Sequence, residues 1–158
     1  MVEKYITNSE QETFKLAKKF AKTLKGGETL CLIGDLGSGK TAFVKGLAKG
    51  LGVDNIITSP TFVLMKVYNI PVMEKAANPS GAMRHLPLVR GELVHIDVYR
   101  LSNGADLEAI GVKDYFNNPS AIVVIEWADR VRAIWPQNCL EINFQTLAGD
   151  EREIKIKK

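Results

Sequence analysis

The sequence contains few cysteines and no long hydrophobic segment. Two cysteines occur among 158 residues, Cys31 and Cys139, and they do not have the spacing of a metal site. No run of apolar residues approaches the roughly 20 that cross a bilayer, and the polar N-terminus predicts no signal peptide. We therefore expect a cytoplasmic protein with reduced thiols and no part in a membrane.

The chain also lacks a strong excess of charge of either sign. The 21 Lys and Arg residues against 18 Asp and Glu residues leave a net charge of +3, which permits an RNA or acidic protein partner but indicates neither. Lysines at 15, 18, 19, 22 and 25 are interpreted as a solvated helix face rather than a nucleic-acid patch. With 46% hydrophobic residues and no internal repeat, we expect one globular domain over residues 1–158.

Residues 34–41 read G-x-x-x-x-G-K-T, the P-loop pattern of phosphate-binding proteins. The glycines let backbone N–H groups point at a polyphosphate, Lys40 supplies positive charge for the β- and γ-phosphates, and the Thr41 hydroxyl is a ligand for Mg²⁺. An apolar run at 29–33 precedes the loop and a helical spacing at 42–51 follows it, which is the setting that the motif needs. The predicted nucleotide contacts here are Asp35, Leu36, Gly37, Ser38, Gly39, Lys40, Thr41 and Ala42.

Two sequence signals of GTP-binding proteins are missing. The chain has no N-K-x-D tetrapeptide, which reads guanine, and no D-x-x-G follows a predicted strand. A nucleotide bound by this P-loop is therefore expected to be ATP rather than GTP.

Two carboxylates follow predicted strands and can complete such a site. Glu126 comes directly after five apolar residues, and Asp97 alternates with His95 and Tyr99 on one face of a strand. Ligands of open α/β sheets bind at the carboxyl ends of strands, so both carboxylates should reach the metal or the attacking water. A solvent-facing strand edge is the alternative for the 95–99 segment. The predicted metal-site residues are Thr41, Asp97 and Glu126, and the predicted catalytic residues are Glu126 and Lys40.

Thr61 and Trp127 are two further candidates for nucleotide contact. The Ser59-Pro60-Thr61-Phe62 turn comes one helix after the P-loop, where a switch segment that senses the γ-phosphate is usual. Trp127 follows Glu126 and should lie near the ligand. An ordinary proline turn and simple core packing are the respective alternatives.

The remaining pattern predicts a three-layer α/β domain with the P-loop NTPase fold. We expect a mainly parallel central sheet with antiparallel edge strands, the last two strands being antiparallel. A capping box at 9–12 predicts a helix that ends at Gly26-Gly27, and three prolines within 69–91 predict a long loop insertion. Strands are expected at 5–7, 29–33, 62–68, 93–99, 121–125, 140–144 and 153–157, and a short helix at 106–110.

These segments together make the chain resemble the TsaE (YjeE) family, small bacterial P-loop ATPases of threonylcarbamoyladenosine synthesis on tRNA. The resemblance covers nearly the whole chain. Beyond the P-loop it rests on S-P-T-F at 59–62, H-x-D-x-Y-R at 95–100 and I-E-W at 125–127. It implies that Asp97 helps to hold Mg²⁺, that Glu126 is important for hydrolysis, that Trp127 lies close to the nucleotide and that Thr61 belongs to the switch. The long 69–91 segment departs from the family pattern.

The resemblance implies an Mg-ATP-binding protein with slow ATPase activity in a tRNA-modification complex. Its implied partners are TsaD and TsaB, and a contact with tRNA through the complex is left open. Two alternatives stand beside this hypothesis. One is an ATP-dependent binding switch with negligible turnover, and the other is a small-molecule kinase, for which the sequence shows no clear arginine-bearing lid.

Overall fold

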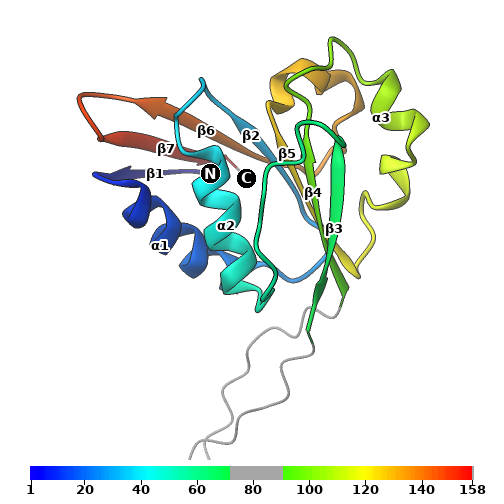
Figure 1. Ribbon diagram of the computed structural model, residues 1–158, viewed down its shortest axis with the longest axis horizontal. Coiled ribbons are helices and arrows are strands. Elements are labelled where there is room, and N and C mark those ends of the chain that lie inside the picture. Colours follow the sequence, from blue (N-terminus) through cyan, green and yellow to red (C-terminus); the bar gives the residue numbers. More distant parts are fainter. Residues whose placement is uncertain (72–90, 158) are drawn as a thin grey trace, which may run out of the picture.

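The computed structural model describes residues 1–71 and 91–157, in which the strands form one mixed sheet between two helical layers (Figure 1). The strand order is β1-β7-β6-β2-β5-β4-β3. The strands are β1 (Val2–Thr7), β2 (Thr29–Ile33), β3 (Met65–Ile70), β4 (Gly91–Asp97), β5 (Ala121–Glu126), β6 (Leu140–Thr146) and β7 (Arg152–Lys157). The helices are α1 (Glu10–Phe20), α2 (Lys40–Gly50) and α3 (Ala105–Ala109), with 3₁₀ segments η1 (Ala21–Thr23), η2 (Val112–Asp114) and η3 (Ala128–Ile134).

The directions of the strands confirm the predicted fold class. The four central strands β6, β2, β5 and β4 run parallel, whereas β1, β7 and β3 pair antiparallel with their neighbours. The last two strands, β6 and β7, pair antiparallel as expected, and β6 also pairs parallel with β2, Leu30 facing Leu140. The reason is that the chain crosses over through η3 after β5, so it enters β6 in the direction of β5.

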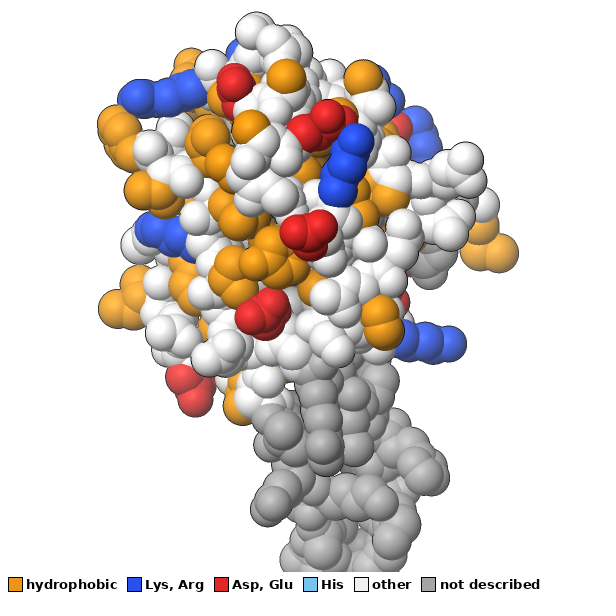
Figure 2. Space-filling view, turned by 90° about the vertical axis from the view of Figure 1, so that its right-hand side faces the viewer, with side chains coloured by type: hydrophobic (Ala, Val, Ile, Leu, Met, Phe, Trp, Pro, Cys, Tyr) orange, Lys and Arg blue, Asp and Glu red, His pale blue; other side chains and the backbone are white. Residues whose placement is uncertain are grey.

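Two cores lie on the two faces of the sheet. Helices α1 and α2 cover one face, and α3 lies on the other side (Figure 1). In β5, Ile122 and Val124 pack toward α1 and α2, while Val123 and Ile125 join the core beneath α3. A strand covered on both faces needs no polar alternation, which explains the apolar run that predicted β5. The outer surface on the α3 side carries hydrophobic side chains between acidic and basic ones (Figure 2).

Helix α1 begins as predicted but ends earlier. The Ser9 hydroxyl accepts a hydrogen bond from the Glu12 N–H, whereas the Glu12 carboxylate accepts from the N–H of Asn8 rather than that of Ser9. The α-helix stops at Phe20 and tightens into η1, well before Gly26-Gly27. The Thr23 hydroxyl donates to the Phe20 carbonyl oxygen at 2.8 Å, which satisfies a carbonyl of the last turn.

Two strand boundaries around the predicted switch also differ. β3 begins at Met65 rather than at residue 62, because the Val63 N–H donates to the Pro60 carbonyl and closes a turn that leaves Phe62 82% exposed. β4 ends at Asp97, so Tyr99 lies beyond the strand. Residues 69, 70 and 91, which were predicted to belong to the insertion, lie in strands instead, since β3 and β4 pair as far as residues 70 and 91. Residues 72–90 lie outside the described part of the chain.

Helices α1 and α2 pack with their backbones in close approach. A methyl group added at Gly46 of α2 would lie 2.2 Å from the carbonyl oxygen of Phe14 and 2.9 Å from the Ala17 side chain. Glycine is therefore required at this position by space, since its φ is ordinary for a helix. In the described ranges, no helix has the length and apolar character needed to cross a membrane.

Replacing Gly46 by alanine should destabilise the protein. Alanine favours an isolated helix by about 1 kcal/mol, but the methyl group must push α1 off α2, and overpacking of this kind typically costs about 1–3 kcal/mol. We expect a lower free energy of unfolding in urea. Lys45→Ala, on the exposed side of the same helix, should change it by less than about 0.5 kcal/mol. A Gly46→Ala protein as stable as the parent would contradict the close approach.

Candidate functional site

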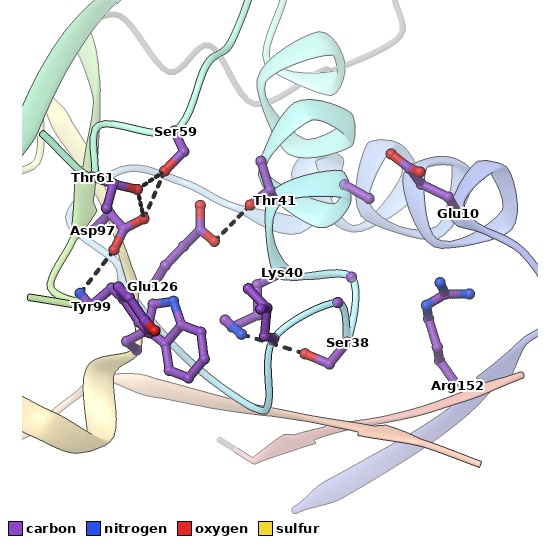
Figure 3. Close-up of a pocket in the computed structure, with 15 residues that line it drawn as sticks. Glu10, Ser38, Lys40, Thr41, Ser59, Thr61, Asp97, Tyr99, Glu126 and Arg152 are labelled. Atoms are coloured by element: carbon purple, nitrogen blue, oxygen red, sulfur yellow. Dashed lines mark hydrogen bonds between the residues drawn. The ribbon is translucent and has the colours of Figure 1, made fainter. Parts of the chain in front are cut away.

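A cavity of about 460 Å³ opens at the carboxyl ends of β2, β5 and β4. This volume lies within the usual range for small-molecule sites. The structure brings the predicted site residues together around it (Figure 3). The exception is Asp35, which does not line the cavity and whose backbone carbonyl oxygen accepts from the Lys40 ammonium. The lining residues that the sequence predicted are Leu36, Gly37, Ser38, Gly39, Lys40, Thr41, Ala42, Thr61, Asp97, Glu126 and Trp127.

The P-loop connects β2 to the N-terminus of α2. Gly39 is the residue before the helix and has φ 102°, a left-handed conformation that favours glycine. A methyl group there would also lie 3.3 Å from Cδ of Arg152. The first turn of α2 leaves backbone N–H groups free to face the cavity. Together with the positive end of the helix dipole, they suit an anion such as phosphate.

Lys40 is a buried cation without a carboxylate partner. Its ammonium donates to the carbonyl oxygens of Gly34 at 2.6 Å and Asp35 at 2.8 Å, and it lies 3.8 Å from the centre of the Trp127 ring. Burial lowers the pKa of Lys40 below its usual value, while the charges of Glu126 and Asp97 act in the opposite direction. Within the described part of the chain, no carboxylate forms an ion pair with Lys40. An anion in the cavity would supply the missing counter-charge.

Glu126 is a buried carboxylate held from two sides. It is 2% exposed; Oε2 accepts from the Thr41 hydroxyl at 2.9 Å, and Oε1 lies 2.7 Å from Nε2 of His95. Figure 3 shows the carboxylate turned toward Thr41 at the start of α2. The pairing of β4 with β5 sets Asp97 opposite Glu126, so both carboxylates face the same end of the cavity.

Asp97 is tied to the Ser59–Thr61 turn. Its Oδ2 accepts from the hydroxyls of Ser59 and Thr61, both at 2.7 Å, and its Oδ1 accepts from the N–H of Tyr99 at 2.9 Å. The segment predicted as a switch therefore contacts the predicted metal carboxylate directly (Figure 3). Ser59 belongs to the site as much as Thr61, and its place two residues earlier in the same motif could have indicated it.

The donor set around the cavity suits Mg²⁺ that arrives with phosphate. A threonine hydroxyl and two carboxylates are oxygen ligands of the kind that Mg²⁺ prefers. Among the residues that the structure describes, no three His, Cys, Asp or Glu side chains converge closely enough to hold a metal by themselves. Mg²⁺ usually keeps several waters and phosphate oxygens in its shell, so Thr41, Asp97 and Glu126 offer an incomplete shell that a polyphosphate would complete.

Trp127 has a strained backbone at the edge of this site. Its φ is 61°, a left-handed conformation that is uncommon for a bulky residue and is often found at functional sites. The conformation sets its ring against Lys40 and 4.9 Å from the ring of Tyr99.

The opposite side of the cavity was missed by the sequence analysis. Glu10 from α1 and Arg152 from β7 line it, and Figure 3 shows both on the far side of the P-loop from Tyr99. No local motif marks either residue. Only the sheet order, which places β7 and α1 near the loop, brings them to the cavity.

Comparison with known proteins yields one consistent family. A family model described as "Threonylcarbamoyl adenosine biosynthesis protein TsaE" matches residues 7–154. A Bacillus subtilis (strain 168) protein named tRNA threonylcarbamoyladenosine biosynthesis protein TsaE is 37% identical over 151 residues, covering 96% of this chain and 82% of the relative. The Treponema pallidum (strain Nichols) protein of the same name is 35% identical over 151 residues, covering 96% of this chain and 97% of the relative.

A solved structure agrees with these sequence relatives. The crystal structure of Bacillus subtilis YdiB superposes with a TM-score of 0.75 at 33% identity, covering 99% of this chain and 84% of that one. The likeness therefore extends over nearly the whole chain.

Trp127 should report the arrival of an anion at Lys40. In a Trp135→Phe background, ATP or ADP is expected to change the fluorescence emission of Trp127. The reason is that bound phosphate changes the surroundings of the Lys40 ammonium, which lies 3.8 Å from the centre of the Trp127 ring. Fluorescence titration compared with calorimetry tests this. Nucleotide binding without any change in emission would show that Trp127 only packs.

Proposed function

The chain belongs to the TsaE family, and from this premise we propose that it takes part in the synthesis of threonylcarbamoyladenosine on tRNA as an Mg-ATP-dependent ATPase. The observation that carries the proposal is the arrangement at the start of α2. Lys40 is a buried cation that forms no ion pair with a carboxylate of the described residues, and the neighbouring Thr41 donates to the Glu126 carboxylate; all three line one cavity. A polyphosphate would supply negative charge beside Lys40, and the Mg²⁺ that accompanies it would take the Thr41 hydroxyl as a ligand.

In this proposal the phosphates bind at the N-terminus of α2. The backbone N–H groups of the P-loop and the Lys40 ammonium bind phosphate oxygens, and Thr41 and Asp97 hold the metal, directly or through water. Mg²⁺, when bound, neutralises charge on the phosphates and on the departing oxygen. Ser59 and Thr61 hold the Asp97 carboxylate in the orientation that this requires.

Glu126 is proposed to act on the attacking water. Water adds to the γ-phosphorus, its proton passes to the carboxylate, and ADP leaves with phosphate as the other product. In the structure both Glu126 oxygens already accept a hydrogen bond, so only their second lone pairs are free for a water. This arrangement supports slow turnover by the chain alone and acceleration by a partner that places the water at one of these lone pairs.

The proposed partners are TsaD and TsaB, with tRNA contacted through their complex. The cavity residues suit a polyphosphate, and none of them is assigned to transfer of a threonylcarbamoyl group. Hydrolysis is therefore proposed to reset the complex while TsaD performs the transfer. The occupied oxygens of Glu126 also favour a second candidate, an ATP-dependent binding switch with negligible turnover. Single-turnover hydrolysis with and without TsaB and TsaD separates the two.

Lys40→Ala should weaken ATP binding by about 10- to 150-fold. This range corresponds to the roughly 1.5–3 kcal/mol of a charge-assisted hydrogen bond. Calorimetry at fixed Mg²⁺ measures it, with Lys45→Ala as a control that removes a lysine from the exposed side of the same helix. An unchanged affinity in Lys40→Ala would remove Lys40 from the proposed phosphate site.

Asp97 and Glu126 should be separable by their variants. Asp97→Ala should lower Mg²⁺-dependent ATP affinity and hydrolysis together. Glu126→Gln keeps the shape of the side chain and should leave affinity nearly intact, while it lowers turnover by about 10²-fold or more, the scale of a general base. ATP affinity at several Mg²⁺ concentrations and hydrolysis with TsaB and TsaD test both.

Glu108→Gln, an exposed carboxylate of α3, serves as the control for that pair. Normal hydrolysis by Glu126→Gln would exclude Glu126 as the base. If Asp97→Ala kept its Mg²⁺ dependence, Glu126 would become the leading metal ligand.

A further inference from the structure

His95 is a fully buried polar residue that the mechanism above does not use. Its side chain is 0% exposed and does not line the cavity. On β4 it pairs with Val124 of β5, and it points to the same face of the sheet as Leu93 and Asp97. Burial of an imidazole among apolar strands costs free energy unless the ring is hydrogen-bonded.

The ring makes one hydrogen bond, and that bond goes to Glu126. Nε2 lies 2.7 Å from Oε1 of the carboxylate, while Nδ1 has no partner among the described residues. A carboxylate accepts hydrogen bonds, so Nε2 carries the hydrogen and Nδ1 is left as a bare acceptor. The Nε2–H of His95 therefore donates to Glu126.

The two bonds to Glu126 come from opposite sides. Thr41 approaches Oε2 from the cavity, whereas His95 approaches Oε1 from inside the sheet. A glutamate side chain has three rotatable bonds, and a single bond to Thr41 would leave the carboxylate free to follow that hydroxyl when a metal takes it up. The bond from His95 does not depend on what occupies the cavity.

We propose that His95 is a positioning residue for ATP hydrolysis, whose Nε2–H fixes the Glu126 carboxylate toward Thr41 and the phosphate end of the cavity. The inference rests on the proposed function, because it assigns a role to a residue beneath the proposed base. Displacement of a reacting group by about 1 Å can cost about 10²-fold in rate, so a fixed carboxylate matters more for turnover than for affinity.

Three substitutions of His95 distinguish positioning from packing. His95→Gln places an amide N–H where Nε2 lies, His95→Asn places one where Nδ1 lies, and His95→Leu fills the space with no donor. We expect single-turnover ATP hydrolysis with TsaB and TsaD to fall about 10- to 100-fold in the Leu and Asn variants and to recover largely in the Gln variant. The affinity for ATP should stay within about threefold in all three.

Leu93→Ala is the matched control for loosening of the strand. It removes buried volume on the same face of β4, two residues before His95, and leaves the hydrogen bond from His95 to Glu126 in place. It should lower thermal stability and leave the hydrolysis rate of the folded protein within about threefold of the parent. If the Leu variant of His95 does not fold, the comparison of Gln with Asn still decides the question, because both retain a polar side chain.

A double-mutant cycle tests whether His95 acts only through Glu126. In the Glu126→Gln background, His95→Leu should cause no further loss of hydrolysis rate. A further loss there, equal rates in the Gln and Asn variants, or a parental rate in His95→Leu would each overturn the inference and leave the proposed function standing. A parent protein that neither binds nor hydrolyses ATP would refute the proposed function itself and this inference with it.

Discussion

The hydrogen bond between Thr41 and Glu126 joins the two halves of the site. It links the first turn of α2 to the carboxyl end of β5, 85 residues apart in the sequence. Its length depends on where α2 sits, which the close approach at Gly46 determines, and on where β5 ends, which its pairing with β2 and β4 determines. A hydrogen bond weakens steeply when its geometry is poor. The strength of the Thr41–Glu126 bond therefore depends both on the packing of α1 against α2 and on the register of β2, β5 and β4.

The same arrangement places several charged groups in buried positions, which is unfavourable for folding. Lys40 is desolvated between two carbonyls and an aromatic ring, and Glu126 and Asp97 are buried opposite each other across two strands. Each group is hydrogen-bonded, but the two carboxylates lie side by side, and Lys40 forms no ion pair with a carboxylate of residues 1–71 or 91–157. Natural proteins keep such unfavourable arrangements where function needs them and recover the stability in the core, here in two cores with every residue of β5 buried.

The sequence predicts the parts of this site that are contiguous or that end a strand. The P-loop is one unbroken segment, and Asp97 and Glu126 could be placed together because parallel strands end at the same edge of a sheet. The bond of His95 to Glu126 was not predicted, since it depends on the order β5-β4 and on register. Glu10 and Arg152 reach the cavity only because β7 and α1 fold back beside the P-loop. The early end of α1 was also not predicted; there the helix tightens into η1 and the Thr23 hydroxyl donates to the Phe20 carbonyl oxygen.

The turn at 59–62 faces two environments at once. Its hydroxyls hold Asp97 from the inside, while the Phe62 ring lies outside with the Arg100 guanidinium 4.2 Å above it. A cation bound at Asp97 shares that carboxylate with the two hydroxyl donors, so its binding is coupled to the conformation of the turn. Thermodynamic linkage is reciprocal. If a cation at Asp97 changes the affinity of another molecule for Phe62 by some factor, that molecule changes the affinity of the cation for Asp97 by the same factor. Binding at Phe62 on the outside of the turn and binding at Asp97 on its inside thus depend on one conformational equilibrium of residues 59–62.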